Sequence, residues 1–237
     1  MSELPLVSII IPVYNHAITL FRSIETLFTQ NYRPLEIIIV NDGSTDNFSE
    51  IEEKITSFSS ENFKIQITTQ PHRGAPAARN YGFRLSQGKY ILFWDADTMG
   101  HTDMIQKMYQ VLSEHPEVGY AYSQFYFGGK LFSSRPFEAE YLKKENFIIT
   151  MSLLRRDLFP GFDESLRRFQ DWDLWLTLLG QGVTGIFIPE VLFEVVTEGR
   201  KGMSNWIPKI FYKLPWKIPA VRRYEEAKNI VIKKHGL

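Results

Sequence analysis

Short apolar runs alternate with segments of helical periodicity through the first half of the chain. An apolar run of about four to eight residues, bounded by turn residues, is typical of a buried strand. Strands that alternate with helices form a parallel-rich sheet that the helices cover. Between the first two runs, Leu20, Ile24 and Leu27 recur at the spacing that places one face of a helix on such a sheet. The predicted strands are residues 7–12, 35–41, 63–69 and 89–94.

The second half of the chain is less regular. Residues 102–113 and 171–179 have the apolar spacing of helices, whereas residues 118–127 are typical of a strand that ends at a Gly-Gly turn. Residues 185–196 predict a late strand, and Pro189 within it requires an edge or a bulge because proline has no N–H to donate. No internal repeat is visible.

The composition favours one large domain. The 237 residues, 44% of them hydrophobic, suffice for the core of a single α/β unit. The chain has no cysteine, which excludes disulfides, thiolate metal sites and a cysteine nucleophile. Its first residues lack the pattern of an export signal, and no apolar stretch is long enough for a transmembrane helix. We therefore expect a cytoplasmic protein without a nucleic-acid partner.

The net charge of zero conceals a basic tail. Residues 200–237 carry ten Lys or Arg against two Glu, a net charge of +8, which leaves −8 on residues 1–199. Trp206, Trp216 and other aromatic residues lie among the lysines, a mixture typical of segments at anionic membrane surfaces. Three prolines interrupt any long amphipathic helix in this tail, which favours packing onto the domain instead. We expect a domain over residues 1–205 and a tail over residues 206–237 that packs on it or contacts the inner face of a membrane.

Two carboxylates follow the fourth predicted strand directly, as Asp95-Ala96-Asp97. Strand side chains alternate, so both carboxylates can project at the carboxyl edge of the sheet, where open α/β folds bind ligands. Paired hard oxygen ligands suit Mg²⁺ or Mn²⁺, which commonly share their coordination shell with phosphate oxygens. The pair therefore indicates a site for a nucleotide diphosphate, although by itself it is equally compatible with a solvated turn.

The first two strands also end in polar or aromatic groups. Tyr14 and Asn15 follow the first, and Asp42 lies in the Asn-Asp-Gly-Ser segment after the second. Right-handed crossovers bring these edges together, so Tyr14 can stack on a base while Asp42 accepts a hydrogen bond from a base N–H. The alternative for Asp42 is a turn with an aspartate cap.

A loop of small residues begins at Gly74 and enters a helix before the fourth strand. Arg79 falls in the early turns of that helix, where its guanidinium and the positive helix end can both face a diphosphate. The glycine spacing matches neither a dinucleotide fingerprint nor a P-loop. An ordinary surface ion pair is the alternative for Arg79.

Five motifs follow one another along the chain: Pro12-Val13-Tyr14-Asn15, Asn41-Asp42-Gly43-Ser44, Ala78-Arg79-Asn80-Tyr81-Gly82, Asp95-Ala96-Asp97 and Gln170-Asp171-Trp172-Asp173-Leu174-Trp175. Their order and approximate spacing over residues 5–205 resemble those of the family 2 glycosyltransferases. The resemblance implies the GT-A fold, in which helices flank a mixed, mostly parallel sheet. It also implies a nucleotide-activated sugar donor, a divalent metal and inversion at the anomeric carbon.

By position, the resemblance assigns the donor site. Tyr14 and Asp42 match the base-binding pair, and Arg79 matches a contact to the diphosphate. Asp95 matches a ribose or metal-shell ligand, and Asp97 matches the direct ligand of Mn²⁺ or Mg²⁺. The same motifs contribute the remaining predicted donor-binding residues, which are Pro12, Asn15, Gly74 and Ala96.

Asp171 resembles the general base of the family. An acceptor hydroxyl must lose its proton as it attacks, and a carboxylate at hydrogen-bond distance can take it. Its position at a helix start predicts that Asp171 stays ionised. The alternative is that Asp171 is only an N-cap and Asp173 an ordinary acid of the first turn.

The chain departs from the family pattern in two places. Many relatives carry a histidine on the late loop that completes the metal shell, whereas residues 193–198 contain none, so water, Glu194 or Glu198 would replace it. Gln170 stands where an acid is common, and no Q-x-x-R-W run occurs, which argues against a processive polysaccharide synthase. Beyond these departures, the sequence offers two alternatives for Arg200 and Lys201. They would close over the diphosphate as a mobile flap, or they would be ordinary surface cations.

These observations predict an inverting, non-processive glycosyltransferase of polysaccharide biosynthesis. It would move a sugar from a nucleotide-diphosphate donor to an acceptor hydroxyl, and a UDP-sugar is the favoured donor. The basic tail favours an alternative, transfer to a polyprenyl phosphate at a membrane surface. The absent histidine favours a third interpretation, a non-catalytic nucleotide-sugar binding protein. Residues 123–169 are expected to select the sugar, glycan or lipid-linked acceptor.

Overall fold

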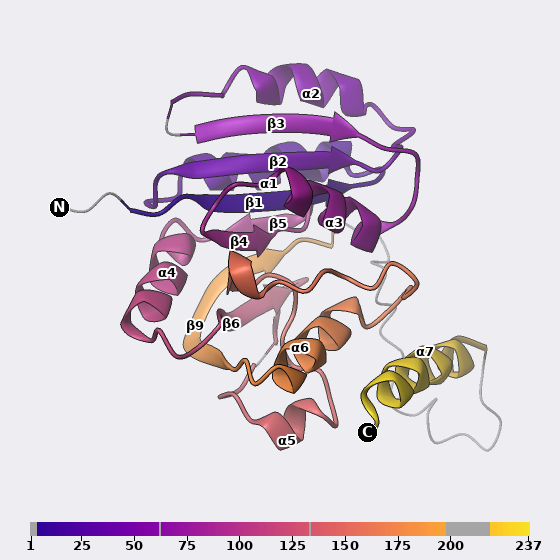
Figure 1. The fold of residues 1–237 in the computed structure, drawn as a ribbon. Helices are drawn as coiled ribbons and strands as arrows, with labels where there is room; N and C mark the ends of the chain where they lie inside the picture. The colour runs from indigo at the N-terminus through magenta and orange to yellow at the C-terminus, as the bar shows by residue number, and fades with distance from the viewer. Residues whose placement is uncertain (1–3, 62, 133, 198–218) are drawn as a thin grey trace.

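The computed structural model describes residues 4–61, 63–132, 134–197 and 219–237. These residues form one mixed sheet with helices on both faces (Figure 1). The strands are β1 (Val7–Val13), β2 (Leu35–Asn41), β3 (Phe63–Thr69), β4 (Tyr90–Phe93), β5 (Thr98–Gly100), β6 (Tyr120–Phe127), β7 (Lys130–Phe132), β8 (Leu153–Arg155) and β9 (Gly185–Val195). The helices are α1 (Ala17–Phe28), α2 (Phe48–Thr56), α3 (Ala75–Leu85), α4 (Met104–Glu114), α5 (Ala139–Leu142), α6 (Gln170–Gly180) and α7 (Pro219–His235), with a 3₁₀ turn at Arg156–Leu158.

The sheet has the strand order β3-β2-β1-β4-β8-β6-β9-β5, and β7 pairs with β6. The pairs among the first four strands are all parallel, as the alternation of strands and helices predicts. The runs of β1, β2 and β4 are almost entirely buried because both faces are covered there, whereas the edge strand β3 alternates apolar and polar residues. β8 enters between β4 and β6 and pairs antiparallel with both, which makes the sheet mixed.

The two faces of the parallel half are covered by different helices. On one face, Leu20, Ile24 and Leu27 of α1 join the core cluster that contains Ile9 and Ile37. On the other face lies α3, in front of the sheet in Figure 1. A side chain at Gly82 of α3 would place its Cβ only 2.5 Å from Ile10 Cγ2, so glycine there permits the close approach of α3 to β1. This approach brings the first turns of α3 to the edge where β1, β2 and β4 end.

The late strand contains the bulge that Pro189 predicts. β6 and β9 are parallel, and their register shifts after Ser123, which pairs with Ile188, because Gln124 pairs with Val191. Pro189 thus lies in a segment without a partner on β6, where its missing N–H costs no ladder bond. The sequence pattern did not reveal β5, β7 and β8, which have three residues each and are too short for a visible alternation.

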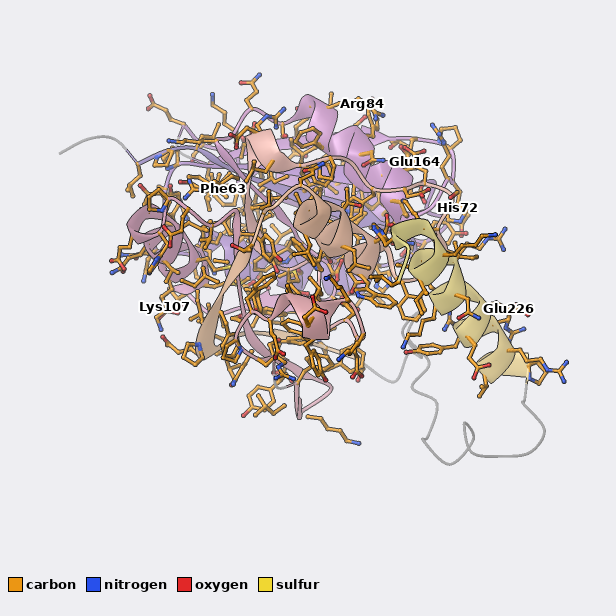
Figure 2. All side chains as sticks on the ribbon, turned by 60° about the horizontal axis from the view of Figure 1, so that its bottom comes forward. Phe63, His72, Arg84, Lys107, Glu164 and Glu226 are labelled. Carbon is orange, nitrogen blue, oxygen red and sulfur yellow. The ribbon has the colours of Figure 1, made fainter. Side chains whose placement is uncertain are left out.

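A helix, α7, ends the chain and packs against α6. The last of the three prolines of the tail, Pro219, is the first residue of α7, a position that tolerates its missing N–H, so α7 extends over the part of the tail that contains no further proline. Val231 is buried in the same core cluster as the apolar face of α6. The outer side of α7 carries charged residues such as Glu226 (Figure 2).

Two basic residues at the end of α7 bind acidic residues near the start of α6. Lys234 Nζ lies 2.9 Å from Asp173 Oδ2 and 2.7 Å from Asp163 Oδ2. His235 Nε2 lies 2.8 Å from Asp173 Oδ1. Asp173 is therefore a buried partner of α7 and not the ordinary first-turn acid that the sequence suggested. The predicted flap residues Arg200 and Lys201 lie outside the described residues.

Replacing Lys234 by methionine is expected to lower the free energy of unfolding at pH 7 by about 1–2 kcal/mol. Hydrogen bonds from Lys234 and Ser165 lower the pKa of Asp163 from 3.8 to about 2. A lowered folded-state pKa stabilises the fold above the ordinary pKa, and the contribution disappears as the pH falls toward about 2. Urea unfolding should therefore show a deficit in K234M that narrows between pH 4 and pH 2. Lys233→Met removes an exposed neighbouring lysine as the control, and equal losses in both variants would contradict the assignment.

Candidate active site

The predicted site residues come together at the carboxyl edge of the parallel strands. β1 lies between β2 and β4 in the sheet, so Tyr14, Asp42 and Asp95 all follow neighbouring strand ends. Pro12 is partly exposed near the end of β1, opposite Val40. Ala96, in contrast, is buried in the core cluster, which leaves its backbone as the group available to a ligand.

Asn15 holds two loops of this edge together. Its backbone is left-handed, with φ of 57°, a conformation that asparagine tolerates better than most residues. Its side-chain Oδ1 accepts a hydrogen bond from the Thr45 N–H at 2.8 Å, and its own N–H donates to Ser44 Oγ at 3.1 Å. The loop after β1 is thereby fixed to the loop after β2, which places Tyr14 beside Asp42.

Asp42 is buried, and its two carboxylate oxygens have four donors close to them. Oδ1 accepts hydrogen bonds from Gln70 Nε2 at 2.7 Å and from the Arg73 N–H at 2.9 Å. Oδ2 accepts one from the Gly74 N–H at 2.8 Å, and His72 Nδ1 lies 2.8 Å from the same oxygen. These contacts fix the loop of residues 70–74 and the start of α3 against the end of β2. Asp42 therefore organises the edge beyond the role of a simple turn cap.

Tyr14 stacks on His72. The two ring centroids are 3.9 Å apart and the ring planes are inclined by 24°, while 41% of Tyr14 remains exposed. Sequence reasoning missed His72 as a residue of the site. The available signal was its position two residues before Gly74, where the predicted donor-binding loop begins.

Arg79 is buried and joins the strand edge to α6. It is 6% exposed, so it is not the surface cation of the alternative interpretation. Its Nη2 donates to Asp95 Oδ1 at 2.8 Å, and its Nη1 donates to Gln170 Oε1 at 3.3 Å. Its Nε has no hydrogen-bond partner among the described residues. A buried guanidinium with an unused N–H suits an anionic ligand.

Asp97, the second of the paired carboxylates, has a perturbed pKa. Burial, with a further contribution from the negative charge of Asp95, raises the pKa of Asp97 from 3.8 to about 7. The carbonyl of Asp97 accepts a hydrogen bond from the Val196 N–H at 2.9 Å, which brings the end of β9 to the pair. A divalent cation would offset the repulsion between the two carboxylates, so Asp95 and Asp97 fit a metal whose other ligands are phosphate oxygens and water.

A third protein ligand is not found in the described residues. They contain no group of three or more His, Asp or Glu side chains placed to hold a metal ion. Glu194, one of the predicted substitutes for the late-loop histidine, is aligned with Met99 and completes no such group. Glu198, the other, lies outside the described residues.

Asp171 is the second residue of α6, and Phe169 occupies the N-cap position, so the N-cap interpretation of Asp171 is wrong. Asn146 Nδ2 donates to Asp171 Oδ2 at 2.7 Å, and the Trp172 N–H donates to Oδ1 at 2.9 Å. Burial nevertheless raises the pKa of Asp171 above its usual value, because desolvation outweighs these hydrogen bonds and the charge of Arg79. The Trp172 N–H at the helix start thus acts to lower this pKa, but burial has the larger effect.

The geometry gives one connected arrangement. The Tyr14 and His72 stack and Asp42 lie at one end, Arg79 connects Asp95 to the start of α6, and Asp171 is held there with a raised pKa. Such an arrangement can bind an aromatic base, a diphosphate with a metal, and a group that loses a proton.

Comparisons with known proteins identify the family and the fold of the chain. A family model described as glycosyl transferase family 2 matches residues 8–175. The UDP-Glc:alpha-D-GlcNAc-diphosphoundecaprenol beta-1,3-glucosyltransferase WfaP of Escherichia coli is 33% identical over 191 residues, which are 75% of this chain and 72% of that protein. Uncharacterized glycosyltransferases of three Rickettsia species are longer, and the chain spans 27% to 31% of their length.

Solved structures of similar fold include Staphylococcus aureus TarS residues 1–349 in complex with UDP-GlcNAc. Its TM-score is 0.72 at 17% identity, over 87% of this chain and 63% of that chain. The mannosyltransferase PcManGT from Pyrobaculum calidifontis, in complex with GDP-Man and Mn²⁺, gives a TM-score of 0.68 at 19% identity, over 84% of this chain and 59% of that chain. These likenesses confirm the predicted α/β fold of the GT-A type.

Proposed function

The chain belongs to glycosyltransferase family 2 and is a glycosyltransferase, and from the geometry of its site we propose an inverting, metal-dependent transfer from a UDP-sugar to an acceptor hydroxyl with Asp171 as general base. The observation that carries this proposal is the contact of Arg79 with both Asp95 and Gln170. It links the carboxylate pair of the donor side to the residue that precedes the base. Family membership also favours an enzyme over the non-catalytic binding protein.

The proposed reaction is a single displacement. The acceptor oxygen attacks the anomeric carbon on the face opposite the nucleotide diphosphate, and the bond from that carbon to the diphosphate oxygen breaks. Asp171 takes the hydroxyl proton as the new bond forms, and the configuration at the carbon inverts. A raised pKa makes the Asp171 carboxylate a stronger base. It also means that a larger fraction of Asp171 is protonated, and therefore inactive, at acidic pH.

Asp95 and Asp97 would hold the divalent metal. When bound, Mg²⁺ or Mn²⁺ would act as a Lewis acid that stabilises charge on the departing diphosphate. Arg79, with its unused N–H, would contact the same phosphates. The raised pKa of Asp97 and the Mn²⁺ in the complex of PcManGT support this assignment.

For the acceptor we propose a sugar hydroxyl on a lipid-linked carrier. The support is WfaP, which by its name transfers glucose to a GlcNAc attached to diphosphoundecaprenol. Transfer directly to a polyprenyl phosphate is the second candidate, because an anionic oxygen needs no base. No helix among the described residues has the length and apolar character to cross a membrane. The two candidates differ in their need for Asp171.

Calorimetry with UDP, GDP, dTDP and CDP, each with Mn²⁺, Mg²⁺ or a chelator, tests the donor side. We expect UDP to bind in the presence of metal and to bind more weakly with the chelator. The acceptor side is tested by incubation of UDP-glucose and UDP-GlcNAc with a GlcNAc-diphospholipid and with a polyprenyl phosphate, followed by NMR of the product anomer. A retained anomeric configuration, or no binding of any nucleotide, would contradict the proposal.

Replacing Asn146 by alanine is expected to shift the acid limb of the kcat profile upward by about one pH unit. The hydrogen bond from Asn146 lowers the pKa of Asp171, so its loss raises that pKa and leaves less of the ionised base at a given acidic pH. Rates measured from pH 5 to pH 9 would show the shift. Asn229→Ala, at an exposed position of α7, is the matched control. An unchanged acid limb with a lower rate at every pH would show that Asn146 does not act through Asp171.

A further inference from the structure

His72 offers Asp42 and Tyr14 the two contacts that a nucleobase would offer them. Its imidazole stacks on Tyr14 at 3.9 Å between ring centroids. Its Nδ1 lies 3.1 Å from the backbone carbonyl oxygen of Asp42, its hydrogen-bond partner, and 2.8 Å from Asp42 Oδ2, so the ring stands directly against the carboxylate. A planar heterocycle that stacks on Tyr14 and donates an N–H to Asp42 is also what base recognition at this site requires.

The carboxylate of Asp42 accepts three hydrogen bonds, and His72 Nδ1 lies against its remaining side at 2.8 Å from Oδ2. Its two oxygens have about four lone-pair positions, and each oxygen has two donors close to it. A base N–H can therefore bind Asp42 only where one of these donors leaves. The donor whose contact with Asp42 costs the least free energy to break is the one that a base would displace.

Three of the four donors are fixed by the fold. The N–H groups of Arg73 and Gly74 belong to the backbone of the loop that starts α3, and Gln70 is buried. The side chain of His72, in contrast, is 53% exposed and lies at the surface of the molecule (Figure 2). Rotation about its side-chain bonds releases Asp42 and Tyr14 without moving the backbone, and the three other donors continue to pair the buried carboxylate of Asp42.

We propose that His72 is an internal competitor for the nucleobase, which must rotate away from Tyr14 and Asp42 before the donor base binds. This inference rests on the proposed function, because it assumes that Tyr14 and Asp42 form the base site. His72 then tunes donor affinity, since the apparent dissociation constant equals the intrinsic one divided by the fraction of molecules in which His72 has left. It thus lowers the affinity for the nucleobase by occupying the site of the ligand.

Removal of the competitor should tighten nucleotide binding. For His72→Ala we expect UDP to bind about 3- to 10-fold more tightly in the presence of Mn²⁺, mainly through a faster association rate. Inorganic pyrophosphate with Mn²⁺ has the diphosphate but no base, so its affinity should be the same in the variant and the wild type. His115→Ala, which removes an exposed histidine paired with Glu117, is the matched control and should change neither affinity.

A measurement on the unaltered protein keeps the inference testable if the variant is poorly folded. The chain has five histidines, and we expect addition of UDP with Mn²⁺ to shift the imidazole NMR signals of His72 toward those of a free side chain. Pyrophosphate should leave those signals in place. Weaker UDP binding in H72A would show instead that His72 supports the base, and His72 signals that do not respond to UDP would equally overturn the proposal. Failure of UDP to bind both the wild type and H72A would count against the proposed donor. Equal UDP affinity in the two proteins would instead count against the role of His72 alone.

Discussion

Replacing Asp171 by asparagine is expected to lower kcat by about 10²- to 10⁴-fold, the range that a positioned general base contributes. The amide keeps the shape of the carboxylate but cannot take the proton of the acceptor hydroxyl. Asp171 itself contacts Asn146 and the Trp172 N–H, whereas the predicted donor contacts belong to other residues. UDP affinity should therefore stay close to that of the wild type.

Single-turnover transfer and calorimetry with UDP on the same preparations separate chemistry from binding. The matched control is Asp157→Asn, which neutralises an exposed carboxylate on the 3₁₀ turn and should leave both quantities unchanged. Near-normal turnover of D171N with a sugar hydroxyl as acceptor would remove Asp171 from its role. Loss of transfer to the sugar but not to a polyprenyl phosphate would identify the phosphate as an acceptor that needs no base.

Replacing Asp97 by asparagine is expected to lower the transfer rate by about a hundredfold or more and to abolish the metal dependence of UDP binding. Burial and the charge of Asp95 raise the pKa of Asp97, while Asp95 is already bound to Arg79. A neutral amide removes the negative charge that would attract the cation. It also removes the repulsion from Asp95, so the folded protein should be no less stable.

UDP titrations with Mn²⁺ and with a chelator measure this effect without a transfer assay. In the wild type the chelator should weaken binding, and in D97N the two titrations should coincide. Asp103→Asn is the control, because it removes a carboxylate that pairs with Lys107 on α4 and not with Asp95. If Mn²⁺ strengthened UDP binding equally in D97N and the wild type, the metal would have to be bound by residues other than Asp97.

The parallel half of the fold could be predicted from local pattern. Strands that are covered on both faces need continuous apolar runs, and the helices between them need one apolar face, so both signals are written in short windows of sequence. The bulge at Pro189 follows from the missing N–H of one residue. The three-residue strands and the place of β8 between β4 and β6 depend on pairing between distant segments, which no local window contains.

The site divides in the same way. The motifs place Tyr14, Asp42, Arg79 and Asp95 at strand ends and a helix start, and parallel topology then brings those ends to one edge. Asn146 and His72 carry no comparable signal, because each acts through long-range contacts, Asn146 to Asp171 and His72 to Tyr14 and Asp42. Their roles became visible only from distances.

The sequence by itself determined the family, the order of strands and helices along the parallel half, and the residue types at the site. Backbone geometry and side-chain chemistry are local properties that the sequence specifies directly. Only the tertiary structure decided the pKa values of those side chains and the partners that they bind. Asp171 has a raised pKa because packing removes its water, and Asp173 is occupied by Lys234 and His235 because α7 folds back onto α6. Desolvation and pairing depend on which distant segments meet, and those meetings are set by the packing of the whole chain.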